Sequence, residues 1–205
     1  KRISFFSDAI AHSSLAGIAI ALVVSLEPII GAILFSLIVS IIILRFEEKK
    51  TISLDTLIGV LFSVSVGLAI FLFSIFPGTG VDVNGLLFGN ILTITQADII
   101  YALILLAVVL VFLLKYSNHM ILLIFNEDLA KLQYKNVNVI RYVFLSLLAI
   151  TIALSVKIIG AILVSALIII PAATSQNFSK NLKQMFIISL LFAIVTVVLG
   201  IYLSL

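Results

Sequence analysis

Asp8 and His12 are the residues of this sequence whose types and spacing could do chemistry. They stand four positions apart inside an apolar stretch, so a helix would place both side chains on one face. An imidazole and a carboxylate on one face can share a divalent cation, because zinc and manganese both accept nitrogen and oxygen ligands. The same pair could instead form a hydrogen bond that stiffens helix packing, or relay protons.

Depth in a membrane would set this pair apart from ordinary surface charges. At about 1.5 Å per helical residue counted from Arg2, Asp8 lies roughly 9 Å deep and His12 roughly 15 Å deep. The second depth is near the middle of a hydrocarbon core about 30 Å thick. An aspartate inside that core costs on the order of 3 kcal/mol unless it faces protein or water. Two ligands from one helix leave a metal site open, which suits an ion in transit.

Membrane helices are the elements that must position this pair. The chain has 205 residues, of which 63% are hydrophobic and 10% charged, and its mean hydropathy is +1.40. Soluble domains are nearer half apolar and a quarter charged, so a soluble globule is excluded. The pattern predicts an all-α polytopic membrane protein with about seven to eight membrane segments in a single domain, residues 1–205. The uncharged runs are 9–26, 28–44, 56–81, 99–114, 142–156, 158–179 and 184–205.

Missing residue types and motifs exclude several classes of function. The chain has no cysteine, so disulfides and thiolate metal sites are ruled out. It has no H-E-x-x-H, G-x-S-x-G or Walker A sequence, so we expect a protein that is not an enzyme and holds no permanent cofactor. If transport needs ATP, a separate subunit must hydrolyse it. The net charge of +3 is not gathered on a basic face, so nucleic acid is not an expected partner.

Basic residues set the expected orientation in the membrane. All but one of the 12 lysines and arginines fall at the N-terminus or within 45–50, 115–141 and 176–183. The positive-inside rule assigns these parts to the cytoplasm. The exception is Lys157, at an outer helix end. It could snorkel to the headgroups, or form a gating pair with an outer acid.

The external segment 77–97 contains a proline and several glycines, which break the preceding helix. Its apolar part, 86–92, predicts a short re-entrant helix. Thr95 with Asp98 three residues later resembles a capping box, which predicts the start of the next membrane helix.

The cytoplasmic segment 115–141 is too long for a simple helix connection. Within it, Asn126-Glu127-Asp128 puts a capping residue and two acids at a helix start, as the helix dipole favours. Leu129 and Leu132 would then share one face. This short helix is either an ordinary interfacial helix or a docking element for a cytoplasmic partner.

Two further patterns indicate structure rather than chemistry. His119 has no carboxylate or histidine at ligand spacing, so we expect a solvated or interfacial side chain. Small residues recur every fourth position in two stripes, which predicts close packing between membrane helices. The stripes are Ala9, Ser13, Gly17 and Ala21, and Gly59, Ser63 and Gly67.

Five stretches resemble, in order, stretches of the membrane subunits of ATP-driven zinc, manganese and iron importers. Together they are distributed along nearly the whole chain, from residue 2 to residue 174, and the last is the most specific. They are residues 2–17 (RISFFSDAIAHSSLAG), 53–63 (SLDTLIGVLFS), 87–92 (LFGNIL), 126–130 (NEDLA) and 156–174 (VKIIGAILVSALIIIPAAT).

This resemblance implies a helical bundle similar to the type II importers, such as the cobalamin importer. It implies a homodimeric permease in the inner or plasma membrane of a prokaryote, with two cytoplasmic ATP-binding subunits and an external metal-binding receptor as partners. Asp8 and His12 would lie on the ion path, and 115–141 would hold the coupling helix. Members carry a helix before and another after this span, so we expect both outside it. The docking residues would be Glu127, Asp128, Leu129, Ala130 and Leu132.

The sequence departs from the family pattern at three positions. The family often has proline where Ala16 stands, aspartate where Asn90 stands and glycine where Tyr134 stands. The change at Asn90 removes an outer carboxylate, and Asn90 joins Lys157 as a candidate gating residue. The change at Tyr134 bears on the C-terminal geometry of the coupling helix.

The leading hypothesis is therefore the translocation subunit of an ATP-driven importer of divalent zinc, manganese or iron, whose only ligand is the transported ion. The alternative is a stand-alone, gradient-driven carrier of divalent metals, which would need no ATPase dock. An intramembrane enzyme is disfavoured by the missing motifs.

Overall fold

The computed structural model describes residues 2–49, 52–76, 83–89, 94–134 and 136–204. All regular structure in these residues is helical, and seven of the helices are long and apolar enough to cross a membrane. This confirms the all-α polytopic prediction. The seven are α1 (Arg2–Val23), α2 (Pro28–Lys49), α3 (Leu54–Ile75), α5 (Gln96–Phe125), α7 (Val137–Ile159), α8 (Ala161–Phe178) and α9 (Leu182–Ser204).

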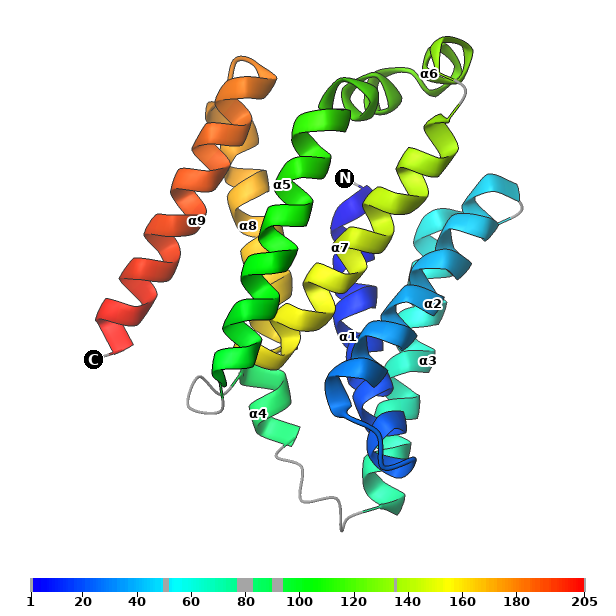
Figure 1. The fold of residues 1–205 in the computed structure, drawn as a ribbon, viewed down its shortest axis with the longest axis vertical. Helices are drawn as coiled ribbons and strands as arrows, with labels where there is room; N and C mark the ends of the chain where they lie inside the picture. The colour runs from blue at the N-terminus through cyan, green and yellow to red at the C-terminus, as the bar shows by residue number, and fades with distance from the viewer. Residues whose placement is uncertain (1, 50–51, 77–82, 90–93, 135, 205) are drawn as a thin grey trace.

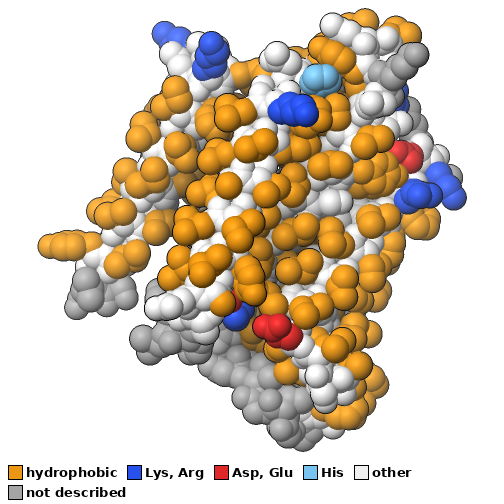
Figure 2. All heavy atoms as spheres, in the orientation of Figure 1, with side chains coloured by type: hydrophobic (Ala, Val, Ile, Leu, Met, Phe, Trp, Pro, Cys, Tyr) orange, Lys and Arg blue, Asp and Glu red, His pale blue; other side chains and the backbone are white. Residues whose placement is uncertain are grey.

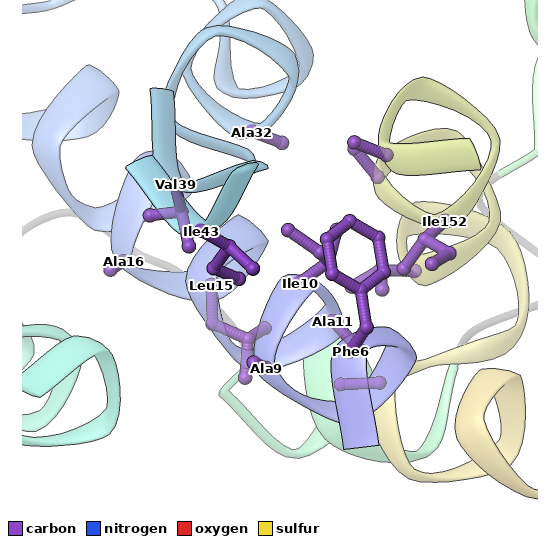
Figure 3. Packing of buried hydrophobic residues seen from close by; sticks show 14 of the residues in the cluster. Phe6, Ala9, Ile10, Ala11, Leu15, Ala16, Ala32, Val39, Ile43 and Ile152 are labelled. Carbon is purple, nitrogen blue, oxygen red and sulfur yellow. The ribbon is translucent and has the colours of Figure 1, made fainter. Parts of the chain in front are cut away.

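Helix α1 lies at the centre of the bundle. It packs on α2, α3, α7 and α8, whereas α9 lies at the edge against α8 (Figure 1). Figure 3 shows Phe6 and Ile10 of α1 lying between α2 and Ile152 of α7. Ile10 and Ile152 are fully buried. The apolar core of the chain is therefore built around the helix that carries Asp8 and His12.

Two short helices lie near the ends of the bundle. Helix α4 (Val83–Phe88) stands where a re-entrant helix was predicted over 86–92, but it begins earlier and ends before Gly89. Gly89 has a φ of 84°, a left-handed conformation that commonly ends a helix. Residues 90–93 of the predicted segment lie outside the described residues. Helix α6 (Glu127–Gln133) follows α5 after one residue, Asn126.

Helix α5 runs further than its uncharged part indicated. It continues from the apolar stretch through residues 115–125, because that stretch contains no proline or glycine. Its start matches the prediction: Thr95 and Asp98 form a complete capping box. The segment 115–141 therefore consists of the end of α5, α6 and the beginning of α7.

The basic parts of the chain gather toward one end of the bundle. The C-terminal end of α2, α6 and the α8–α9 connection all lie toward that end (Figure 1). Figure 2 shows most basic side chains of this face toward that end, with an apolar surface covering the middle. Such a surface suits lipid, and the arrangement agrees with the predicted topology.

Candidate functional site

Asp8 and His12 lie on the least covered face of α1. Both are half-buried, whereas Ser7, Ala9 and Ser13 beside them are fully buried. The ring of His12 meets the ring of Phe62 of α3 edge to face, with centroids 4.7 Å apart. This contact limits the orientations that the imidazole can take.

Asp8 and His12 lack hydrogen-bond and ion-pair partners in the described part of the chain. Neither Asp8 nor His12 forms a hydrogen bond or an ion pair there, so the two do not bond to each other. The described residues also contain no group of three or more side chains able to hold a metal ion. One copy of the chain therefore offers two ligands, a carboxylate and an imidazole, and leaves the remaining coordination positions open.

Small residues fix α1 against its neighbours. The Ser13 hydroxyl lies 3.0 Å from the Ser65 hydroxyl of α3, which joins the two helices by a buried hydrogen bond. Gly17 crosses Gly31 of α2 so closely that a Cβ on Gly17 would lie 2.8 Å from Phe35 Cβ. The first small-residue stripe is thus confirmed as a packing seam.

The second stripe does not pack within the described chain. Gly59, Ser63 and Gly67 of α3 are exposed, and a Cβ on either glycine would meet nothing within 4 Å. The predicted packing seam is therefore not formed within the described residues of this chain. Their spacing indicates that the small side chains share one face of α3, but it does not indicate which surface covers that face.

A buried ion pair lies at the opposite end from α6. The Lys157 ammonium lies 2.5 Å from Asp98 Oδ1, and the side chain of Asp98 is only 4% exposed. The other carboxylate oxygen accepts hydrogen bonds from the Thr95 backbone N–H and hydroxyl. One aspartate thus caps α5 and ties it to the end of α7. Of the two alternatives predicted for Lys157, the gating pair required a partner acid, and Asp98 is such an acid. Asn90 lies outside the described residues.

Beside this ion pair the chain makes a tight turn. Gly160 alone separates α7 from α8, with a φ of 81° that side-chain-bearing residues rarely adopt. A Cβ there would lie 2.5 Å from the Leu87 carbonyl oxygen of α4, and a Cβ on Gly89 would lie 2.8 Å from Ile159 Cα. Helix α4 is therefore seated backbone to backbone on the α7–α8 corner, one turn from Lys157.

Helix α6 presents leucines outward. Asn126 caps it as predicted, accepting a hydrogen bond from the Leu129 N–H. Leu129 is 52% exposed and Leu132 85% exposed, whereas Ala130 is completely buried. The apolar face available to a partner is therefore Leu129 and Leu132. Ala130 instead packs α6 onto its own chain; of Glu127 and Asp128 the structure describes only the helical backbone.

His119 is less open than the sequence suggested. It is half-buried, and its ring lies against the rings of Tyr116 and Tyr134. Tyr134 ends α6 with a φ of −129°, an extended conformation that needs no glycine. The end of α6 in this chain therefore requires no glycine at position 134.

Seven candidate spans, a half-buried carboxylate and imidazole on the central helix, and a short helix at one end of the bundle with outward leucines suit a membrane transport subunit. Comparison with known proteins agrees with this class. The chain belongs to the ABC 3 transport family, which it matches over residues 1–205.

Individual relatives cover the whole chain. It is 29% identical over 204 residues to the high-affinity zinc uptake system membrane protein ZnuB of Haemophilus influenzae, spanning 78% of that protein. It is 32% identical to the manganese import system permease protein ScaB of Streptococcus gordonii, spanning 73% of it. Among solved structures, PsaBC from Streptococcus pneumoniae in complex with Fab superposes with a TM-score of 0.81 at 32% identity. That match covers 98% of this chain and 72% of the other.

Proposed function

We propose that this chain is the translocation subunit of an ATP-driven importer of divalent transition-metal ions. It is a transporter subunit rather than an enzyme, and a separate subunit hydrolyses ATP. The observation that carries the proposal is the Asp8–His12 pair, half-exposed on the central helix with no partner in the described chain. The zinc and manganese systems in which its relatives are named support the choice of cargo.

The chemistry of the pair suits a passing ion. Carboxylate and imidazole ligands accept zinc, manganese and ferrous iron alike. Two ligands hold such an ion weakly, and a bare carboxylate inside the membrane attracts a cation strongly enough to draw it in. The ion is cargo and no permanent cofactor is needed.

A second copy of the chain completes the site. An aspartate in the hydrocarbon core must face protein or water, and this chain covers Asp8 only in part. Two copies facing each other across an axis would offer four ligands, two from each. Movement of the copies would then separate the ligands and release the ion.

The remaining partners follow from the two ends of the bundle. At the basic end, the exposed leucines of α6 would dock in a groove of the cytoplasmic ATP-binding subunit. At the opposite end, an external metal-binding receptor would deliver the ion. The assembly would lie in the inner or plasma membrane of a prokaryote, and the whole chain would act as one permease domain.

The outer ion pair is a candidate gate. Asp98 and Lys157 tie α5 to α7 beside the corner on which α4 sits. Separation of this pair would free the outer ends of the two helices during outward opening. Asn90, which lies outside the described residues, stays a candidate gating residue.

Substitution of the two ligands tests the proposal. Asp8→Asn and His12→Ala should each lower zinc and manganese uptake in cells at least tenfold, because one ligand is lost from both copies. Copurification with the ATP-binding subunit and basal ATP hydrolysis should stay within twofold. Asp55→Asn, at an exposed carboxylate in the first turn of α3, is the matched control and should transport normally.

Three outcomes would contradict parts of this proposal. Near-normal uptake in either variant would remove that residue from the ion path. Loss of assembly in both variants would favour a structural role for the pair. Uptake that persists without any ATP-binding subunit would favour the gradient-driven carrier.

A further inference from the structure

Helix α6 has few points of attachment to the rest of the chain. Seven residues are too few for a helix to be stable alone, so its position depends on side-chain contacts. Leu129 and Leu132 point away from the described chain. Ala130, which is fully buried, and Tyr134 are among the residues that hold α6 in place.

Tyr134 begins a row of aromatic rings that leads from α6 into the membrane part of α5. Its ring centroid lies 3.9 Å from that of His119, which lies 5.7 Å from Tyr116. The Tyr116 ring in turn lies 5.0 Å from buried Phe112. The α5 members are spaced three and four residues apart, so one helix face carries them all. We name these four residues the ring row: Tyr134, His119, Tyr116 and Phe112.

The contact of α6 with α7 is smaller than its contact with α5. A cavity of about 330 Å³ lies where α5, the end of α6 and the start of α7 meet, and its lining includes Tyr116, His119 and Tyr134 of the ring row as well as Val139 of α7. Because packed side chains transmit displacement, the contact of the Tyr134 ring with the His119 ring gives α6 a direct route to α5 beside this cavity.

His119 is held in the row by its rings rather than by hydrogen bonds. Its Nδ1 is buried and has no hydrogen-bond partner among the described residues. A buried nitrogen without a partner is unfavourable, so ring contacts must compensate for it. Phenylalanine would preserve the ring contacts at this position, whereas alanine would remove them.

We propose that the ring row is the mechanical link that carries movement of α6 into helix α5 during transport. The inference rests on the proposed function, in which α6 docks on the ATP-binding subunit. Tyr134 and His119 are then positioning residues, which touch neither the ion nor ATP.

The test measures zinc or manganese ions transported per ATP hydrolysed by the whole importer in proteoliposomes. Tyr134→Ala and His119→Ala should each lower this ratio at least fivefold, while affinity for the ATP-binding subunit changes less than twofold. Tyr134→Phe and His119→Phe should restore the ratio, because both keep a ring. The double alanine variant should have a ratio no lower than that of the more impaired single variant, since each substitution breaks the same link.

Val139→Ala is the matched control, because it enlarges the same cavity without breaking the row, and its ratio should equal that of the unaltered chain. An unchanged ratio in Tyr134→Ala would overturn the proposal, and so would failure of Tyr134→Phe to restore it. Failure of the unaltered chain to bind any ATP-binding subunit would instead refute the proposed function, so the two are distinguishable.

Discussion

At the scale of single residues, Asp98, Asp8 and His12 differ in the hydrogen bonds and ion pairs that they form. Asp98 has a cation and two hydrogen-bond donors, whereas Asp8 and His12 have no such partner in the described chain. A satisfied buried charge holds helices together, and an unsatisfied one attracts a ligand or a second subunit. Asp98 therefore holds α5 against α7, and the proposed function assigns ion binding to Asp8 and His12.

We expect removal of Lys157 to destabilise the protein more than removal of the charge on Asp98. Lys157→Met should destabilise the protein by about 3 kcal/mol, because it leaves an almost fully buried carboxylate without its cation. Asp98→Asn should cost less, because the 37% exposed lysine can reach water or headgroups. Thermal loss of the helical circular dichroism signal in detergent measures both variants. Equal melting temperatures for the two would show that the buried carboxylate does not dominate the pair.

At the scale of elements, α6 has two faces with separate tasks. Ala130 packs it onto its own chain, and the two leucines face outward. A bulky residue at Ala130 would displace α6 itself, so it cannot test docking alone. The exposed leucines can be changed without disturbing that packing.

We therefore expect Leu132→Glu to weaken binding of the ATP-binding subunit at least tenfold, because a charge would enter an apolar groove. Copurification or surface plasmon resonance in detergent measures the affinity. Asn118→Glu places the same charge at another exposed position near the end of α5 and should bind normally. Equal binding by Leu132→Glu and the unaltered chain would refute docking through this face.

At the scale of the whole molecule, the absence of cysteine allows a clean test of topology. Single cysteines at Ser25 and Asn118 lie at exposed positions that the basic-residue pattern assigns to opposite sides. An impermeant maleimide should label Ser25→Cys from outside, and Asn118→Cys only in inverted vesicles. Gln176→Cys should behave as Asn118→Cys does. Labelling of Ser25→Cys and Asn118→Cys from one side would reject the orientation.

The features that could be predicted from the sequence are those that depend on residues close together in the chain. Apolar runs fixed the spans, and the caps at Thr95 and Asn126 follow from local hydrogen bonds. Asp8 and His12 were visible because polar residues are rare within such runs. The partner of Lys157 lies 59 residues away, and the contact of Tyr134 with His119 also depends on how separate helices meet. Local patterns carry no such distance information, so the ring row could not be predicted.

The placement of α1 also bears on how the protein is made. Of the seven candidate spans, α1 has the lowest mean hydropathy and the largest share covered by other helices. A nascent span of this kind partitions weakly into lipid by itself, and two of the helices that surround it, α7 and α8, are synthesised much later. We therefore expect α1 to settle late during biogenesis, when the C-terminal half has entered the bilayer. A half-synthesised chain would then contain no finished ion path, which protects the cell from leakage during assembly.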